Sequence, residues 1–492
     1  MNIAEAKEYI KDTVELYLKK DEFGDYKIPV IRQRPVFLLG APGIGKTAIM
    51  SQIASELNIA LVSYSMTHHT RQSALGLPFI KEKEYGGTTY SVSEYTMSEI
   101  IASVYDTIKE SGVTEGILFL DEINCVSETL YPSMLQFLQY KVFGKHTVPE
   151  GWVIVTAGNP PEFNKAVREF DVVTLDRLKV IDIEADYPAW KKYALDTGLH
   201  GAILNFLESN KEYFYNIETT AFGKNYVTAR GWEDLSDMIK LYEEGDKKVT
   251  DSLIGQYIKN ETITKEFAAY YDLYNKYKKN YDTEAIFKGR VDEKMAAEVN
   301  NSAVDERLAF TGLLSDVISS EIKSIIRDYD VLKEIRGSIS NITSKETADA
   351  KAYLITLVSA REKQLADKQR AGILSAKDKT KHKIIISIYK ELLDKLVKAE
   401  DAKEFYNGKI SLLKQRVSEE QIRIDNLFAA MSKIFGEESN EMLVLVTELT
   451  LAKDSADFFA IFGSASYEKY NELLKVGDRK DNLRREILEI MQ

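Results

Sequence analysis

Proline is distributed unevenly along this chain of 492 residues. All nine prolines lie between Pro29 and Pro188, and residues 189–492 contain none. Because proline is strongly disfavoured inside helices, a long proline-free region rich in Lys, Glu, Leu, Ile and Ala is typical of helical structure. Its apolar residues recur at steps of three and four, as on one face of a helix. Examples are Ile385, Ile388, Tyr389, Leu392 and Leu396, and the series Leu412, Leu413, Val417, Ile424, Leu427 and Phe428.

Residues 1–190 show a different pattern. Short apolar runs alternate with segments of helical spacing, and such runs suit strands that are buried on both faces of a parallel sheet. The segments between them suit crossover helices, so we expect an α/β core with a parallel sheet. The expected strands are 35–39, 60–66, 116–120, 152–157 and 179–185. Segment 78–95 carries Gly86 and Gly87 between two β-prone arms, which predicts a hairpin inserted between helices.

Charge and cysteine content limit the classes of protein to consider. The formal net charge is −12, which argues against a DNA-coating protein but does not describe local patches. Cys125 is the single cysteine, so a disulfide within the chain is impossible and a thiolate zinc site is not expected. The first 20 residues carry charges throughout, and no run approaches the roughly 18 consecutive apolar residues of a membrane span. We expect a cytoplasmic protein.

Residues 40–47, GAPGIGKT, fit the pattern G-x-x-x-x-G-K-[ST] between an apolar run and a helical stretch. This strand–loop–helix context is the one that a phosphate-binding loop requires. Its glycines let the backbone aim N–H groups at phosphate oxygens, and the helix N-terminus favours an anion. Lys46 would reach the β- and γ-phosphates and Thr47 would ligate Mg²⁺, whereas a simple glycine-rich turn would not need this context. The residues expected to bind ATP are Gly40, Ala41, Pro42, Gly43, Ile44, Gly45, Lys46, Thr47 and Ala48.

A second part of the site follows the apolar run 117–120, which ends in Asp121 and Glu122. A carboxylate at this strand end, beside the phosphate loop, is placed to hold Mg²⁺, so Asp121 is the expected metal ligand together with Thr47. Glu122 is the candidate general base that polarises the attacking water. Two solvated acids at a strand end are the simpler interpretation, but the upstream phosphate loop favours the functional one.

The order of these motifs, followed by a strand that ends in Asn159, resembles the AAA+ ATPases. More narrowly it resembles their MoxR-like branch, which has a β-hairpin insert in the second helix. The resemblance covers about residues 20–260. It implies Mg-ATP as the bound ligand and a ring, typically a hexamer, in which one subunit completes its neighbour's site. Together with the helical pattern of the later residues, it leads us to expect an α/β core over 1–187, a small helical lid over 188–260 and an all-α C-terminal domain over 261–492, an adaptor or arm, with a further boundary near Gly289 as an alternative.

The resemblance also assigns three further catalytic residues. Asn159 matches the sensor 1 position, which orients water at the γ-phosphate. Arg177 matches the arginine finger that is donated to the neighbouring subunit, with Arg168 as the rival. Arg230 matches sensor 2 at the start of a lid helix, with Thr228 as a plausible N-cap. Two segments depart from the family pattern, 67–78 and 140–151.

The function that the resemblance implies is ATP-driven remodelling of a separate client protein, with a von Willebrand A domain protein as one candidate. A nucleotide-gated scaffold with little turnover and a nucleic-acid motor of the same branch are the alternatives. The acidic balance disfavours the motor. The aromatic residues of 267–281 could suggest base stacking, but their helical spacing favours packing in a core.

Overall fold

The computed structural model describes residues 1–68, 70–164, 166–220, 223–281 and 283–473. The chain divides into two compact units. The first unit comprises residues 1–186 and 355–390, and the second comprises residues 187–354 and 391–492. In the part of the chain that the structure describes, no helix has both the length and the apolar character of a membrane-spanning segment.

The first unit is built on a five-stranded parallel sheet in the order β2-β5-β8-β1-β9. All five predicted strands are confirmed, and they form this sheet together. Every residue of β8 is buried, as expected for a central strand that is covered on both faces. The strands are β1 (Val36–Gly40), β2 (Ala60–Ser65), β5 (Gly116–Asp121), β8 (Trp152–Gly158) and β9 (Lys179–Ile183).

Helices before and between these strands complete the α/β core. The N-terminal helix α1 packs on α2, where Lys7 and Lys11 form ion pairs with Glu56 at 2.5 and 2.9 Å. Asn2 begins α1 with a reciprocal capping box to Glu5. The helices are α1 (Ile3–Tyr17), α2 (Lys46–Leu57), α3 (Arg71–Leu75), α4 (Glu99–Ser111), α5 (Tyr131–Tyr140) and α6 (Val172–Leu175).

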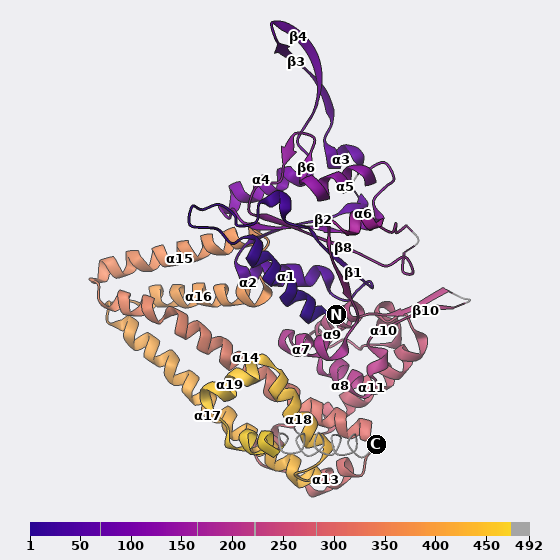
Figure 1. Ribbon diagram of the computed structural model, residues 1–492. Helices are drawn as coiled ribbons and strands as arrows, with labels where there is room; N and C mark the ends of the chain where they lie inside the picture. The colour runs from indigo at the N-terminus through magenta and orange to yellow at the C-terminus, as the bar shows by residue number, and fades with distance from the viewer. Residues whose placement is uncertain (69, 165, 221–222, 282, 474–492) are drawn as a thin grey trace, which may run out of the picture. The chain divides into compact units, whose positions relative to one another are not determined.

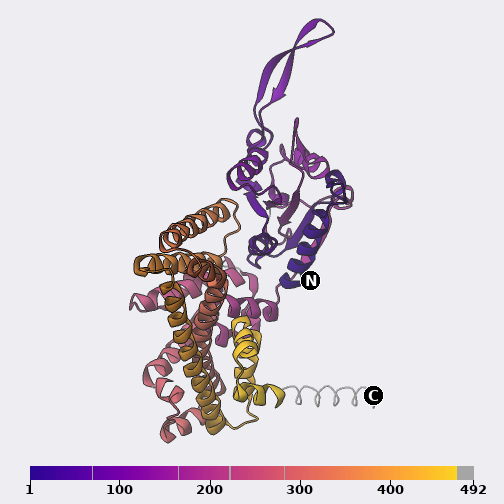
Figure 2. The same cartoon turned by 90° about the vertical axis from the view of Figure 1, so that its left-hand side faces the viewer.

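Two hairpins are inserted in this core. The predicted one is confirmed as β3 (Pro78–Tyr85) and β4 (Thr88–Tyr95), joined by Gly86 and Gly87 with φ of 59° and 81°. Positive φ at both turn residues matches the twist of a tight hairpin, and glycine adopts it without strain. The hairpin extends away from the sheet in both views (Figure 1 and Figure 2). The second is short, β6 (Val142–Phe143) and β7 (His146–Thr147), within the unusual segment 140–151.

Residues 355–390 supply a further contact to the sheet. They include the end of α15 (Thr347–Arg370) and the start of α16 (Ala376–Lys395). β2 lies at the edge of the sheet, and the backbone N–H of Leu61 in β2 donates to the carbonyl of Ala371 at 2.9 Å. An edge strand exposes unpaired backbone groups, so the turn between these helices satisfies one of them.

The second unit is mainly helical, which confirms the prediction from the absence of proline. It contains α7 (Tyr187–Thr197), α8 (Gly201–Ser209), α9 (Ala229–Glu244), α10 (Asp251–Tyr257), α11 (Glu261–Asn280), α12 (Thr283–Phe287), α13 (Glu293–Asn300), α14 (Val304–Thr343), α17 (Asp401–Phe435), α18 (Asn440–Leu451) and α19 (Lys453–Phe462). One hairpin, β10 (Asn216–Thr220) and β11 (Gly223–Val227), was not predicted.

One hydrophobic cluster joins residues 187–258 to residues 263–313. The aromatic side chains of α11 lie inside it, which confirms that their helical spacing reflects packing. Phe267 is fully buried, and Tyr270, Tyr271, Tyr274 and Tyr277 are at most 9% exposed. The apolar core is therefore continuous across residue 260, and the division into a lid and a C-terminal domain stays a prediction.

Candidate nucleotide-binding site

The phosphate loop joins β1 to α2 and has the backbone that its glycines predict. Gly43 and Gly45 have φ of 75° and 98°, a left-handed region that favours glycine. Gly40 lies so close to β9 that an added Cβ would stand 2.7 Å from the Ile183 carbonyl oxygen. Gly45 is the N-cap of α2 and has no side chain to cap it. The first-turn N–H groups of α2 therefore remain available to an anion.

Lys46 begins α2 and is 8% exposed. Its ammonium group donates to the carbonyl oxygens of Gly40 and Ala41 at 2.7 and 2.8 Å. It also donates to Oδ1 of Asn159 at 2.9 Å. The lysine thus connects the loop to the end of β8, and its charge lies inside the cradle where phosphate oxygens would bind.

The acidic strand end lies beside the loop, as predicted. Thr47 donates from Oγ1 to Oδ2 of Asp121 at 2.8 Å. The other oxygen of Asp121 accepts from the backbone N–H of Glu122 at 2.9 Å, which fixes the rotation of the carboxylate. Sheet order explains the meeting, because the carboxyl ends of parallel strands gather at one edge, where open α/β sheets bind ligands.

Glu122 has contacts that the sequence did not indicate. Its Oε2 accepts hydrogen bonds from the hydroxyls of Ser65 and Thr67, each at 3.0 Å. Its backbone has φ of 55°, in the left-handed region that a side chain rarely adopts. Ser65 ends β2 directly opposite Asp121 of β5. The carboxylate is therefore held toward the end of β2 by two donors.

A second unpredicted residue, Asn124, supports the end of β8. Its Nδ2 donates to the backbone carbonyl of Asn159 at 2.8 Å, and its side chain is 3% exposed. A Cβ on Gly158 would stand 2.4 Å from Oδ1 of Asn124, so only glycine allows this contact. With Oδ1 of Asn159 turned to Lys46, the Nδ2 group of Asn159 remains a donor for a phosphate oxygen or water.

The two candidate arginine fingers differ in their surroundings. Arg177 is exposed and follows α6, whose N-cap Asp171 accepts from the backbone N–H of Thr174 at 2.8 Å. Hydrogen bonds from Thr174, with a smaller effect of the Arg177 charge, hold the pKa of Asp171 below its usual value. Arg168 instead forms an ion pair with Glu128 in the same unit. Both arginine roles stay predictions.

Arg230 belongs to the second unit, in the first turn of α9. Its side chain is exposed. Thr228 is the N-cap, and its hydroxyl accepts from the N–H of Gly231 at 3.2 Å. The expected cap is therefore present, whereas the assignment of Arg230 to the γ-phosphate stays a prediction.

The residues present fit a triphosphate with Mg²⁺. Thr47 and Asp121 offer two hard oxygen atoms side by side, and Mg²⁺ takes few protein ligands and completes its shell with phosphate and water. Among the described residues, no group of three or more His, Cys, Asp or Glu could hold a metal ion. The uncapped start of α2 and the Lys46 ammonium supply the positive potential that phosphates require.

A comparison with protein families agrees with this geometry. Residues 36–175 match the ATPase family associated with various cellular activities (AAA). Among solved structures, one described as "a putative ATPase" from Cytophaga hutchinsonii is similar at 13% identity, over 52% of this chain and 89% of that one. Its TM-score is 0.23, which is too low to indicate a shared fold. A comparison with curated proteins finds no match. Residues 36–175 therefore form an AAA-family ATPase domain, and the chain is an ATP-binding and ATP-hydrolysing protein.

Proposed function

We propose that this ATPase is a member of the MoxR-like branch that works as a ring, binds Mg-ATP between subunits and remodels a separate client protein. The observation that carries the proposal is the meeting of Lys46, Thr47, Asp121 and Asn159 at one sheet edge through hydrogen bonds of 2.8–2.9 Å. The hairpin between β2 and α4 supports the assignment to this branch.

The reaction follows from the residues at the site. Lys46 and the first-turn N–H groups of α2 would orient and neutralise the β- and γ-phosphates. Asp121 and Thr47 would hold Mg²⁺, which neutralises charge that develops on the phosphate oxygens. Glu122 would take a proton from the attacking water while the water oxygen bonds to the γ-phosphorus. The bond between the γ-phosphorus and the bridging β-phosphate oxygen breaks at the same time, which releases ADP and phosphate. Asn159 would orient that water or the γ-phosphate through its Nδ2 group.

The general-base assignment is tested by Glu122→Gln, which keeps the shape of the side chain and removes its basicity. We expect phosphate release to fall by about 10²–10⁴-fold, while a fluorescent ATP analogue still binds. Glu110→Gln, an exposed acid of α4 in the same unit, is the matched control and should keep full turnover. Full activity of the Glu122 variant would refute its role.

The ring proposal is tested by complementation between two inactive variants. Arg177→Ala subunits can bind ATP but lack the finger, whereas Lys46→Ala subunits carry the finger but cannot bind ATP. If Arg177 acts on the neighbour's nucleotide, a mixture of the two regains turnover that neither shows alone. Arg168→Ala in place of Arg177→Ala tests the rival. Mixed oligomers without regained activity would contradict the role in trans.

A second candidate function is a nucleotide-gated scaffold with little turnover. The observation that favours it is the position of Glu122, whose carboxylate is held by Ser65 and Thr67. A base held in this way would leave the basal rate low. The scaffold would be favoured over the remodelling ring if ATP turnover is slow and is raised neither by a partner nor by removal of the Ser65 and Thr67 hydroxyls that hold Glu122.

A further inference from the structure

A groove of about 600 Å³ lies along the seam between α14 and α17 in the second unit. Its floor is apolar: Leu332, Leu413 and Val417 line it and are 7–9% exposed. Tyr329 and Phe462 form one end, with their rings edge to face at 5.6 Å between centroids. The seam is therefore an apolar channel that the described residues leave uncovered.

Helix α19 packs against α14 and stops where this groove begins. Gln421 of α17 contacts the C-terminal end of α19: its Nε2 donates to the carbonyl oxygens of Phe462 and Gly463 at 2.9 and 3.1 Å. Ile461, in the last turn of α19, lines the groove and is 45% exposed. The groove thus begins at the apolar end of a helix that already packs in this unit, so a further helix could extend that packing.

The rim of the groove is basic. Lys333 and Arg336 of α14 and Lys414 of α17 line it and are exposed, and none of the described lining residues is acidic. The whole chain has 77 acidic and 65 basic residues, so the charge of the basic rim is opposite in sign to the net charge of the chain. A partner with acidic flanks would gain from charge complementarity here.

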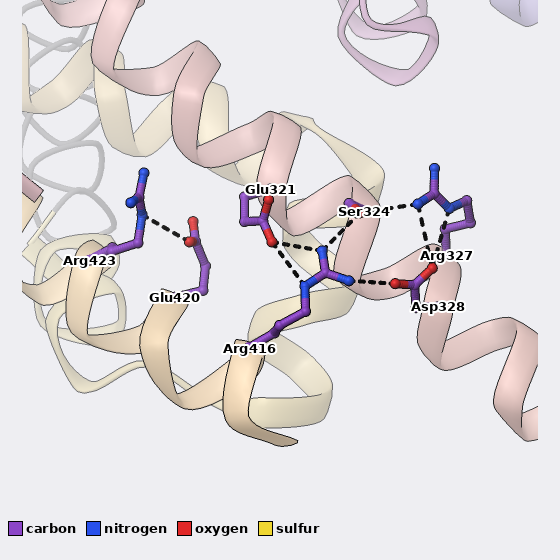
Figure 3. A network of polar contacts seen from close by, with 7 residues as sticks. All are labelled: Glu321, Ser324, Arg327, Asp328, Arg416, Glu420 and Arg423. Carbon is purple, nitrogen blue, oxygen red and sulfur yellow. Dashed lines mark hydrogen bonds and ion pairs between the residues drawn. The ribbon is translucent and has the colours of Figure 1, made fainter. Parts of the chain in front are cut away.

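The two helices that form the groove are tied together by an ion-pair network (Figure 3). Arg416 of α17 contacts Glu321 at 2.7 Å and Asp328 at 2.5 Å, both on α14. Its guanidinium also donates to the hydroxyl of Ser324 at 2.9 Å. Because these bonds set the spacing of α14 and α17, the groove is formed before anything binds, and binding does not have to order it.

We propose that this groove binds an acidic amphipathic helix of a partner protein. The lining residues of α17 extend from Tyr406 to Gln421, which at ~1.5 Å per residue is roughly 22 Å, the length of a helix of about 15 residues. An apolar stripe would lie on Leu332, Leu413 and Val417, and flanking Glu or Asp would face the basic rim. A nucleic acid would bring phosphates to the rim but would leave this apolar floor without a complement.

The test is fluorescence anisotropy on the full-length protein without nucleotide, so ring formation and ATP turnover do not affect the readout. The probe is a labelled 18-residue synthetic helix with Leu on one face and Glu on both flanks. The matched control peptide carries Lys for every Glu. We expect the acidic peptide to bind at least tenfold more tightly than the basic one.

Two sets of variants then locate the binding. Reversal of the rim's charge, with Lys333→Glu, Arg336→Glu and Lys414→Glu, should weaken binding of the acidic peptide at least tenfold and strengthen binding of the basic one. Reversal of three exposed lysines outside the groove, with Lys294→Glu, Lys403→Glu and Lys433→Glu, makes the same net change and should leave the preference unaltered. Ile461→Asp, at an exposed position, should weaken binding of the acidic peptide without unfolding the chain.

Several outcomes would overturn the proposal. Equal binding of both peptides, or a rim reversal that changes nothing, would exclude charge-directed docking. Tighter binding of single-stranded DNA than of the acidic peptide, lost on rim reversal, would assign the groove to nucleic acid. Tighter binding of a peptide of residues 474–492 would identify the chain's own tail as the occupant. A self-association that rim reversal abolishes would identify a second copy.

Discussion

The hydroxyl of Thr47 donates a hydrogen bond of 2.8 Å to the carboxylate of Asp121, 74 residues further along the chain. This bond connects the start of α2 to the end of β5 and places two oxygen ligands of the kind that Mg²⁺ prefers next to one another. The backbone N–H of Glu122 holds the second carboxylate oxygen, so the side chain cannot rotate freely away from the loop. The pair is the clearest point at which the residues can be matched to a metal ion.

Asp121→Asn should separate metal binding from nucleotide binding. The amide keeps the size of the side chain but removes the charge that attracts Mg²⁺, so we expect the Mg²⁺ concentration for half-maximal turnover to rise about tenfold or more and the maximal rate to fall. Binding of ATP without Mg²⁺ should change little. A Mg²⁺ titration of phosphate release measures this, with Asp12→Asn as the exposed control. An unchanged Mg²⁺ requirement would contradict the ligand assignment.

The hydrogen bonds that hold Glu122 predict a pair of substitutions that raises ATP turnover. Ser65→Ala with Thr67→Ala removes both donors to Oε2 and frees the carboxylate to face the nucleotide. We therefore expect basal ATP turnover to rise several-fold, while the Michaelis constant for ATP stays within about twofold. Steady-state phosphate release measures both. A fall in turnover would show instead that these hydroxyls hold Glu122 in its working position.

Asn124 is expected to be a positioning residue. Asn124→Ala removes the bond to the Asn159 carbonyl, a partly buried acceptor, which costs about 1–3 kcal/mol. Because the end of β8 then loses its support, the catalytic rate should fall more than ATP affinity does. Gly158→Ala, which pushes the same amide away, should produce the same split between rate and affinity. Loss of stability with unchanged turnover would leave Asn124 a purely structural residue.

The strands and the phosphate loop could be predicted from the sequence because their signals are local. The run Trp152–Gly158 is almost entirely apolar because both of its faces are covered, and this pattern is visible in seven adjacent residues. The contacts of Ser65 and Asn124 could not be predicted in this way, since they depend on which strands lie next to one another. A polar residue at the end of a predicted strand, such as Ser65, is the signal that could have identified the first of these contacts.

Two features of the second unit show the limit of sequence periodicity as a signal. Leu412 and Leu413 were both assigned to the apolar face of α17, but Leu412 is 57% exposed, whereas Leu413 is 9% exposed. Adjacent helical residues point about 100° apart, so a narrow seam cannot cover both. The hairpin of β10 and β11 was missed because Asn216–Val227 is mostly polar and lacks the alternation of a half-buried strand.

A buried carboxyl group on α17, that of Glu420, predicts how stability depends on pH. Its side chain is 1% exposed, and its nearest cation is Nε of Arg423 at 3.2 Å (Figure 3). The pKa of Glu420 is raised from 4.5 to about 7, mainly by burial; the Arg423 and Arg416 charges oppose the rise, and the Glu321 and Glu284 charges add to it. The folded chain therefore holds this proton at pH values where the unfolded chain has released it.

The sign of the effect follows from linkage. Since the pKa of Glu420 is higher in the folded state, its contribution to stability is complete below about pH 4.5 and is lost as the pH rises to about 7, by at most about 3 kcal/mol. Glu420→Gln stays neutral at every pH, so it should match the natural protein near pH 4 and exceed its thermal stability near pH 8. Glu419→Gln, an exposed neighbour, should leave the pH dependence unchanged. Thermal unfolding at both pH values decides the matter, because an equal loss of stability in the natural protein and the Glu420 variant would show that Glu420 is ionised in the fold and held by Arg423.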